Sequence, residues 1–308
     1  MKIANSALDL VGNTPLVRLE RIACAHGCAA EVVAKLEKCN PAGSAKDRVA
    51  VSMIEDAEKR GLLKPGALLI EPTSGNTGVG LAMAAACKGY KLILTMPASM
   101  SVERRLLLSA MGAQIVLTDA SAGMSGSVAK AEELMKENPG AFMPSQFDNP
   151  ANPAAHKSTA EEIWRDTEGE VDVFVACMGT GGTVSGTGRV LKEKNQSVRV
   201  IAVEPAESPL ITEGRSGAHG IQGIGANFIP ENYDASVVDE VLTVSTEEAY
   251  AFGRELAAKE GLLCGISSGA AVAAAVRLAK LPEYAGKRIV VLLPDTGERY
   301  PSTPMFKE

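Results

Sequence analysis

A lysine near the start of an expected helix is the first residue placed for covalent chemistry. Lys46 follows Ser44, a good N-cap residue, and Asp47 lies three residues after that serine. We therefore expect Lys46 in the first helical turn, where the positive end of the helix dipole favours its neutral amine. A neutral amine can form a Schiff base with an aldehyde. The alternative is an exposed lysine whose stem bends back into solvent.

A polar turn follows the expected strand at residues 67–71. It carries Thr73, Ser74, Asn76 and Thr77 and opens into an apolar helix. Hydroxyls, an amide and backbone N–H groups at a helix start can hold a carboxylate or a phosphate. The alternative is a capped turn without a ligand, but one cap needs fewer polar residues than this turn has. We therefore expect an anion site here.

Two further loops lie at expected helix starts. The first is glycine-rich and consists of Gly179, Thr180, Gly181, Gly182 and Thr183. Its glycines let backbone N–H groups approach and enclose a phosphate. The dinucleotide-binding fingerprint fails because Val184 occupies the third glycine position, although Glu204 ends the next strand as an acidic ribose partner would. In the second loop Ser268 offers a hydroxyl, which in that position is most often only a cap.

Other candidates for catalysis or metal binding are few. His156 lies in a polar helix start, where we expect a solvated role. Cys24, His26 and Cys28 have ligand-like spacing, but a zinc site needs a fourth ligand such as Cys39. We interpret this stretch as a surface loop between two strands and expect no metal site. Hydrolase chemistry lacks a visible base.

Apolar strands alternate with helix-periodic segments along most of the chain. The expected strands cover residues 67–71, 91–96, 114–118, 171–177, 198–204 and 288–293. The expected helices cover residues 101–111, 125–137, 152–166, 183–194, 246–260 and 267–281. This alternation is typical of an α/β fold in which helices cover mainly parallel sheets.

Turn-rich stretches near residues 40 and 148 suggest that one domain is inserted in another. The early apolar stretches 16–19 and 31–36 would then return to the later sheet. The expected division is a larger domain of residues 1–39 and 146–308 and a smaller domain of residues 40–145.

The composition argues against a nucleic-acid-binding, membrane-spanning or disulfide-bonded protein. The 308 residues include 37 acidic and 31 basic side chains, which gives a net charge of -6 and no basic face for nucleic acid. The start of the chain lacks signal-peptide features, and no apolar run reaches the roughly 20 residues of a membrane span. Six scattered cysteines suit reduced thiols. We expect a cytoplasmic protein that acts on small molecules.

Taken together and in this order, the four loops resemble those of the cysteine synthase (O-acetylserine sulfhydrylase) family. These are fold-type II pyridoxal-phosphate enzymes related to the tryptophan synthase β-subunit. The resemblance runs from residues 10–16 to residues 293–300 and so covers nearly the whole chain. It implies two three-layer α/β domains with mainly parallel twisted sheets, the larger binding the cofactor and the smaller being mobile.

The resemblance also implies roles for single residues. Lys46 would hold pyridoxal 5'-phosphate as a Schiff base and then act as the catalytic base, while residues 179–183 bind the phosphate. Asn76 would contact the ring hydroxyl. Ser268 would face the pyridine nitrogen, and a hydroxyl there suits β-elimination better than transamination. The substrate would be held by Thr73, Ser74, Asn76, Thr77 and Gln146.

The implied reaction joins O-acetyl-L-serine and sulfide to give L-cysteine and acetate, in a homodimer. Cystathionine formation or release of hydrogen sulfide from cysteine on the same scaffold is the alternative. A nucleotide-dependent dehydrogenase, or a non-catalytic partner of the C-terminal tail of serine acetyltransferase, represents other classes. Asn227 stands where many relatives have glycine; asparagine tolerates positive φ, and its amide can alter the preferred nucleophile or leaving group.

Overall fold

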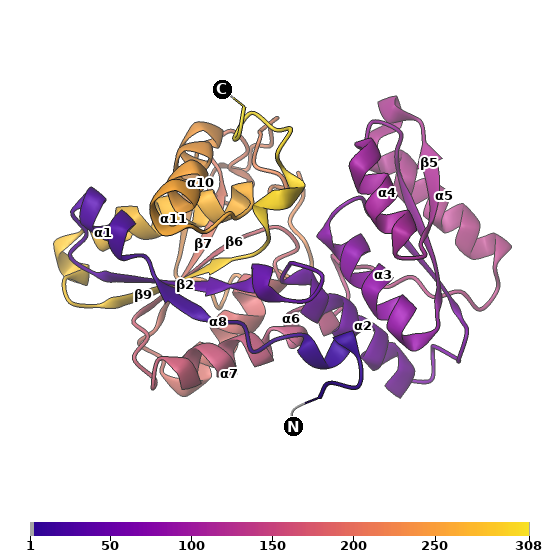
Figure 1. Cartoon of the computed structure of the whole chain (residues 1–308), viewed down its shortest axis with the longest axis horizontal. Coiled ribbons are helices and arrows are strands. Elements are labelled where there is room, and N and C mark those ends of the chain that lie inside the picture. The colour runs from indigo at the N-terminus through magenta and orange to yellow at the C-terminus, as the bar shows by residue number, and fades with distance from the viewer. Residues whose placement is uncertain (1–2, 308) are drawn as a thin grey trace. The chain divides into compact units, whose positions relative to one another are not determined.

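The computed structural model describes residues 3–307, which form two compact units (Figure 1). The first unit contains Asn40–Asn152 together with the N-terminal segment up to Val11. The second unit contains Gly12–Cys39 and the chain from Pro153 onward. Each unit therefore collects chain segments that are distant in sequence.

The first unit is built on a parallel sheet of three strands in the order β3-β4-β5. The strands are β3 (Leu68–Pro72), β4 (Lys91–Pro97) and β5 (Gln114–Thr118). The helices are α2 (Lys46–Lys59), α3 (Asn76–Lys88), α4 (Val102–Ala110) and α5 (Gly123–Glu137). Ile70 and Ile93 pack with Ala131 of α5 in a small core. Apolar residues in adjacent strands thus bury one face of this sheet under a helix.

The second unit is built on a six-stranded sheet in the order β1-β2-β9-β6-β7-β8, in which only the β1–β2 pair is antiparallel. Its strands are β1 (Leu16–Arg18), β2 (Glu31–Leu36), β6 (Val173–Cys177), β7 (Arg199–Pro205), β8 (Glu240–Val244) and β9 (Arg288–Leu293). Its helices are α1 (Glu20–His26), α7 (Lys157–Asp166), α8 (Gly182–Lys194), α9 (Leu210–Glu213), α10 (Thr246–Glu260) and α11 (Ile266–Ala279). Short helix α6 (Ala151–Ala155) contains the point where the two units divide.

Short 3-10 helices complete the described chain. They are η1 (Ala7–Leu10), η2 (Glu37–Cys39), η3 (Ala120–Ala122), η4 (Pro282–Tyr284) and η5 (Gly297–Arg299). Between residues 3 and 307, no helix is long and apolar enough to cross a membrane.

The expected α/β fold with mainly parallel sheets is confirmed, and β2 does pair with β9 of the later sheet. Two expected elements are corrected, and one strand was missed. The stretch around Cys24 is helix α1, ended by Gly27 at φ 66°, and not a loop. The helix expected at residues 152–166 is interrupted at His156. Strand β8 was not expected, because this edge strand buries only Val244 fully and shows a weak apolar pattern.

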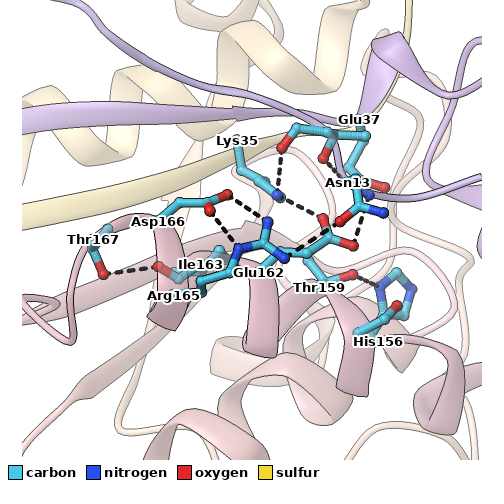
Figure 2. Close-up of polar contacts among 12 residues, drawn as sticks. Asn13, Lys35, Glu37, His156, Thr159, Glu162, Ile163, Arg165, Asp166 and Thr167 are labelled. Carbon is cyan, nitrogen blue, oxygen red and sulfur yellow. Dashed lines mark hydrogen bonds and ion pairs between the residues drawn. The ribbon is translucent and has the colours of Figure 1, made fainter. Parts of the chain in front are cut away.

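A buried ion pair ties three parts of the second unit together (Figure 2). Lys35 Nζ of β2 donates to Glu162 Oε2 of α7 at 2.7 Å and to the carbonyl oxygen of Thr14 at 2.6 Å. Glu162 Oε1 also accepts the backbone N–H of Asn13, a residue with φ 47°. Lys35 is fully buried. The pair therefore fixes the strained turn before β1 against the helix.

Candidate functional site

In the first unit, Lys46 is the first residue of α2. The helix begins one residue later than a Ser44 N-cap predicts, because Ala45 takes the N-cap position. The Ser44 hydroxyl nevertheless accepts the backbone N–H of Lys46 at 3.2 Å, and Asp47 Oδ2 reaches back to the N–H of Ala42 at 2.6 Å. Lys46 therefore lies in the first turn of α2, at the positive end of the helix dipole, with its N–H bonded to the Ser44 hydroxyl.

Close packing of α3 on α2 fixes the position of Lys46 relative to the polar turn. A Cβ on Gly80 of α3 would lie 2.8 Å from the carbonyl oxygen of Lys46 and 3.1 Å from Ala50 Cβ. Only glycine allows this approach. The start of α2 is thus held beside α3, which the polar turn opens.

The polar turn before α3 joins residues that are far apart in sequence. Its N-cap, Gly75, offers no side-chain cap, so the first N–H groups of α3 are not satisfied by their own N-cap side chain. The hydroxyl of Thr77 donates to Gln146 Oε1 at 2.5 Å. Thr73, Ser74 and Asn76 precede Thr77 directly in the chain. Five of the expected site residues therefore gather at one edge of this unit, with donors suited to a carboxylate.

Sequence reasoning missed Glu71, at the end of β3. Its Oε2 accepts the N–H of Ser145 at 2.9 Å and its Oε1 accepts the N–H of Gln146 at 3.1 Å. Burial raises the pKa of Glu71 to about 7, against the lowering effect of these two hydrogen bonds, and the charge of Asp148 adds to the rise. The available signal was a single carboxylate ending a buried apolar strand, directly before the polar turn.

In the second unit, the glycine-rich loop connects β6 to α8 through backbone contacts that exclude side chains. A Cβ on Gly179 would lie 2.4 Å from the carbonyl oxygen of Gly223. Gly181 has φ 81°, and a Cβ there would lie 2.7 Å from the backbone nitrogen of Tyr233. The N-cap of α8 is Gly181, which supplies no side-chain cap. The N–H groups at this helix start are therefore arranged to receive an anion.

Ser268 of α11 is fully buried, and its hydroxyl has no hydrogen-bond partner in the structure. The Sγ of Cys177, at the end of β6, donates to the carbonyl oxygen of Ser267 at 3.2 Å. Burial raises the pKa of Cys177 to about 12, so the thiol remains a protonated donor. This contact joins the start of α11 to the strand that leads into the glycine-rich loop. The Ser268 hydroxyl at that place is therefore open to a hydrogen bond with a ligand atom.

The structure also places His156 and Asn227. His156 is not solvated but fully buried, and its Nε2 lies 3.1 Å from Thr183 Oγ1 of the glycine-rich loop. The reason is the close approach of α8, since a Cβ on Gly186 would lie 2.0 Å from the carbonyl oxygen of Pro153. Asn227 does adopt positive φ, 62°, and accepts a hydrogen bond from Ser208 at 3.3 Å.

Glu204 is not available as a ribose partner, which removes the support for a dehydrogenase. Its carboxylate is buried and accepts the N–H groups of Ile211 and Thr212 at 2.8 and 3.0 Å. Among residues 3–307, no group of three or more His, Cys, Asp or Glu side chains is placed to hold a metal ion. His26 instead contacts Glu255 at 2.8 Å.

Parallel α/β sheets, helix starts without N-cap side chains and a lysine in a first helical turn are features that suit an enzyme with a phosphorylated aldehyde cofactor. The comparison with protein families is more specific. Residues 7–295 match the family described as pyridoxal-phosphate dependent enzyme, so the chain belongs to that family. The chain is accordingly a pyridoxal-phosphate enzyme.

Individual relatives cover almost the same length. Cysteine synthase A of Escherichia coli (strain K12) is 51% identical over an alignment of 308 positions, which covers 97% of this chain and 94% of that protein. The crystal structure of O-acetyl serine sulfhydrylase isoform 3 from Entamoeba histolytica is 47% identical, with a TM-score of 0.97 over 100% of this chain and 92% of that one. The crystal structure of a hydrogen sulfide-producing enzyme from Fusobacterium nucleatum is 48% identical. Its TM-score is 0.93, and the match covers 97% of this chain and 99% of that one.

The residues present fit pyridoxal phosphate. Lys46 offers a primary amine at a helix start, and the loop of residues 179–183 offers a glycine cradle that a Cβ would fill. The unsatisfied hydroxyl of Ser268 suits a pyridine nitrogen, because it can donate a hydrogen bond without transferring its proton. Each of these groups, taken by itself, is chemically suited to one polar feature of this cofactor.

Proposed function

We propose that this protein is a cysteine synthase, which replaces the acetate of O-acetyl-L-serine with sulfide to give L-cysteine. The observation that carries the proposal is the buried Ser268 hydroxyl without a partner. A neutral hydroxyl facing the ring nitrogen limits the electron-withdrawing power of the cofactor, which favours loss of a β-substituent over transamination. The likeness to cysteine synthase A over almost the whole chain supports the same activity.

Lys46 has two tasks in this reaction. When bound, pyridoxal phosphate supplies an aldehyde for amino groups and a conjugated ring that accepts electrons from the substrate Cα. Lys46 Nζ would hold this aldehyde and, when free, would accept the proton from the substrate Cα. Lys46 is the first residue of α2, and both tasks require its neutral amine.

The remaining site residues bind and orient. Thr73, Ser74 and Thr77, with Gln146, hold the substrate carboxylate at the uncapped start of α3. Asn76 donates to the ring hydroxyl. The N–H groups of residues 179–183 hold the phosphate at the start of α8. Thr183 is oriented in turn by the buried His156, whose Nε2 lies 3.1 Å from its hydroxyl.

Product analysis tests the proposal against other reactions of the same scaffold. The purified enzyme is incubated with O-acetyl-L-serine and either sulfide or homocysteine, and separately with L-cysteine alone. We expect L-cysteine from sulfide to form fastest. Faster formation of cystathionine would assign the enzyme to a different β-replacement. Faster release of sulfide from L-cysteine would assign it the activity for which the Fusobacterium nucleatum relative is described.

Gly181→Ala is expected to remove most of the bound cofactor. The φ of 81° costs any other residue about 1–2 kcal/mol, and the new Cβ would collide with the backbone of Tyr233. The loop must then move away from the geometry that holds the phosphate. Cofactor content after dialysis, measured by visible absorbance and by total phosphate, reports the loss.

Gly214→Ala is the matched control for this variant. Gly214 has φ 68°, but a Cβ there would meet nothing within 4 Å. The control therefore carries the backbone strain without the collision, and it should keep its cofactor. Equal cofactor content in the two variants would contradict the phosphate role of the loop.

The assembly and location of the enzyme belong to the same proposal. We place it in the cytoplasm as a homodimer, because its six cysteines are free and the family resemblance implies a dimer. The resemblance also leads us to propose binding of the C-terminal tail of serine acetyltransferase. Sedimentation of the holoenzyme gives its mass, and titration with a synthetic tail peptide tests the binding. A monomeric mass would contradict the proposed homodimer. A titration without heat of binding would contradict the proposed binding of the acetyltransferase tail.

A further inference from the structure

We propose that Glu71 is a positioning residue which holds Gln146 in place for the substrate carboxylate. The inference rests on the proposed function for the role of Gln146. Glu71 itself lies behind the turn, at the end of β3, and is 1% exposed. It therefore acts through the backbone of the next segment and does not touch the substrate.

The two hydrogen bonds to Glu71 fix a backbone conformation that is otherwise disfavoured. Ser145 has φ 55°, in the left-handed region that non-glycine residues rarely adopt. Its N–H and the N–H of Gln146 each donate to a different oxygen of the Glu71 carboxylate, at 2.9 and 3.1 Å. One carboxylate thus satisfies two successive backbone donors at the strained position.

Gln146 itself is held by two further hydrogen bonds. Gln146 Oε1 accepts the hydroxyl hydrogen of Thr77 at 2.5 Å, and the carbonyl oxygen of Gln146 accepts Asn152 Nδ2 at 2.7 Å. Both ends of Gln146 are therefore held within the first unit. If the Glu71 contacts fail, the Ser145 turn can relax and the Gln146 amide loses its fixed position beside Thr77.

The charge on Glu71 controls how well it can hold these donors. Only the ionised carboxylate has two strong acceptor oxygens, because the protonated form uses one oxygen as a donor. The pKa of Glu71 is raised to about 7, first by burial and further by Asp148 on the same turn. The residue paired with Glu71 on the neighbouring strand β4 is Leu94, which carries no charge. The two hydrogen bonds from the Ser145 and Gln146 N–H groups to Glu71 should therefore weaken as the pH falls through about 7. Above that pH, where Glu71 is ionised, both should be fully formed.

Glu71→Gln tests the inference with little change in shape. A carboxamide can accept one N–H group but presents its own donor to the other, so one of the two contacts must fail. In the holoenzyme, we expect hydrogen–deuterium exchange at the Ser145 and Gln146 amides to rise about tenfold, the equivalent of one charged hydrogen bond. We also expect KM for O-acetyl-L-serine to rise about tenfold while kcat changes less than about twofold.

The pH profile separates this role from a general structural one. In the wild type, KM for O-acetyl-L-serine should rise between pH 8 and pH 6, and the exchange of the two amides should rise with it. In Glu71→Gln both should be high and lack this dependence. A pH dependence that is unchanged in the variant would overturn the inference, and so would unchanged amide exchange.

Two more variants keep the result interpretable. Glu204→Gln alters another buried carboxylate that accepts two backbone N–H groups, at Ile211 and Thr212, and should leave KM unchanged. Gln146→Ala should raise KM as much as Glu71→Gln or more. If Gln146→Ala raises KM but Glu71→Gln does not, the positioning role is wrong while the proposed function stands. If Gln146→Ala leaves KM unchanged, the substrate role of Gln146 is wrong, and the inference falls with it.

Discussion

Lys46→Ala is expected to lower kcat for L-cysteine formation by about a thousandfold or more, the range typical of losing a general base. This corresponds to about 4 kcal/mol of transition-state stabilisation. The variant lacks the amine that holds the cofactor aldehyde and removes the substrate proton, while the backbone N–H of residue 46 can still donate to the Ser44 hydroxyl. Initial rates of cysteine formation at saturating O-acetyl-L-serine measure the loss.

Two control variants distinguish the amine from its surroundings. Lys157 is the first residue of α7 and is exposed, so Lys157→Ala removes a lysine from the same helical position without touching the site. It should keep full activity. Lys46→Arg keeps a long cationic side chain, but a guanidinium stays protonated and cannot act as the base. Substantial turnover in either Lys46→Arg or Lys46→Ala would contradict the role of the lysine.

Lys35→Met is expected to destabilise the second unit by about 3–5 kcal/mol, because it removes the buried ammonium group that pairs with the Glu162 carboxylate. The carbonyl oxygen of Thr14 loses a donor as well. The single tryptophan, Trp164, lies on α7 two residues beyond Glu162 and reports unfolding of this unit by its fluorescence. Urea unfolding of the variant should show a lower midpoint.

A surface ion pair provides the comparison for this loss. Lys192 Nζ lies 2.8 Å from Asp239 Oδ2 near the surface, and Lys192→Met should cost about 1 kcal/mol or less. The double variant Lys35→Met/Glu162→Leu should recover part of the stability, since it also removes the buried carboxylate that has lost its Lys35 partner. The N–H of Asn13 still lacks its acceptor, so recovery should be incomplete. If Lys35→Met and Lys192→Met were equally stable, the buried pair would not tie this unit together.

Much of the fold could be predicted because its strongest signals are local. Strands β5 and β9 and helix α10 have the expected bounds, since each shows a clear apolar period and α10 has a capping box at Ser245. The glycine-rich loop could also be found, because its special residues are consecutive. The polar turn before α3 was visible for the same reason.

What could not be predicted depends on contacts between distant residues. Glu71 meets Ser145 across 74 positions, and Lys35 meets Glu162 across 127. No spacing or period encodes such pairs, which arise only when the sheets assemble. His156 was misjudged for the same reason, because its polar neighbours suggested solvent whereas α8 in fact covers it. A charged or ionisable residue inside an apolar strand was the one available clue, and it marks Lys35 and Glu71 alike.

The most direct test of the account is covalent trapping of the cofactor on the holoenzyme. Borohydride reduction fixes the bond between the cofactor and its lysine, and peptide mass mapping then identifies the modified residue. We expect the cofactor mass on Lys46, in close to one copy per chain. An unmodified Lys46, with the cofactor mass on another lysine or on none, would contradict the central claim.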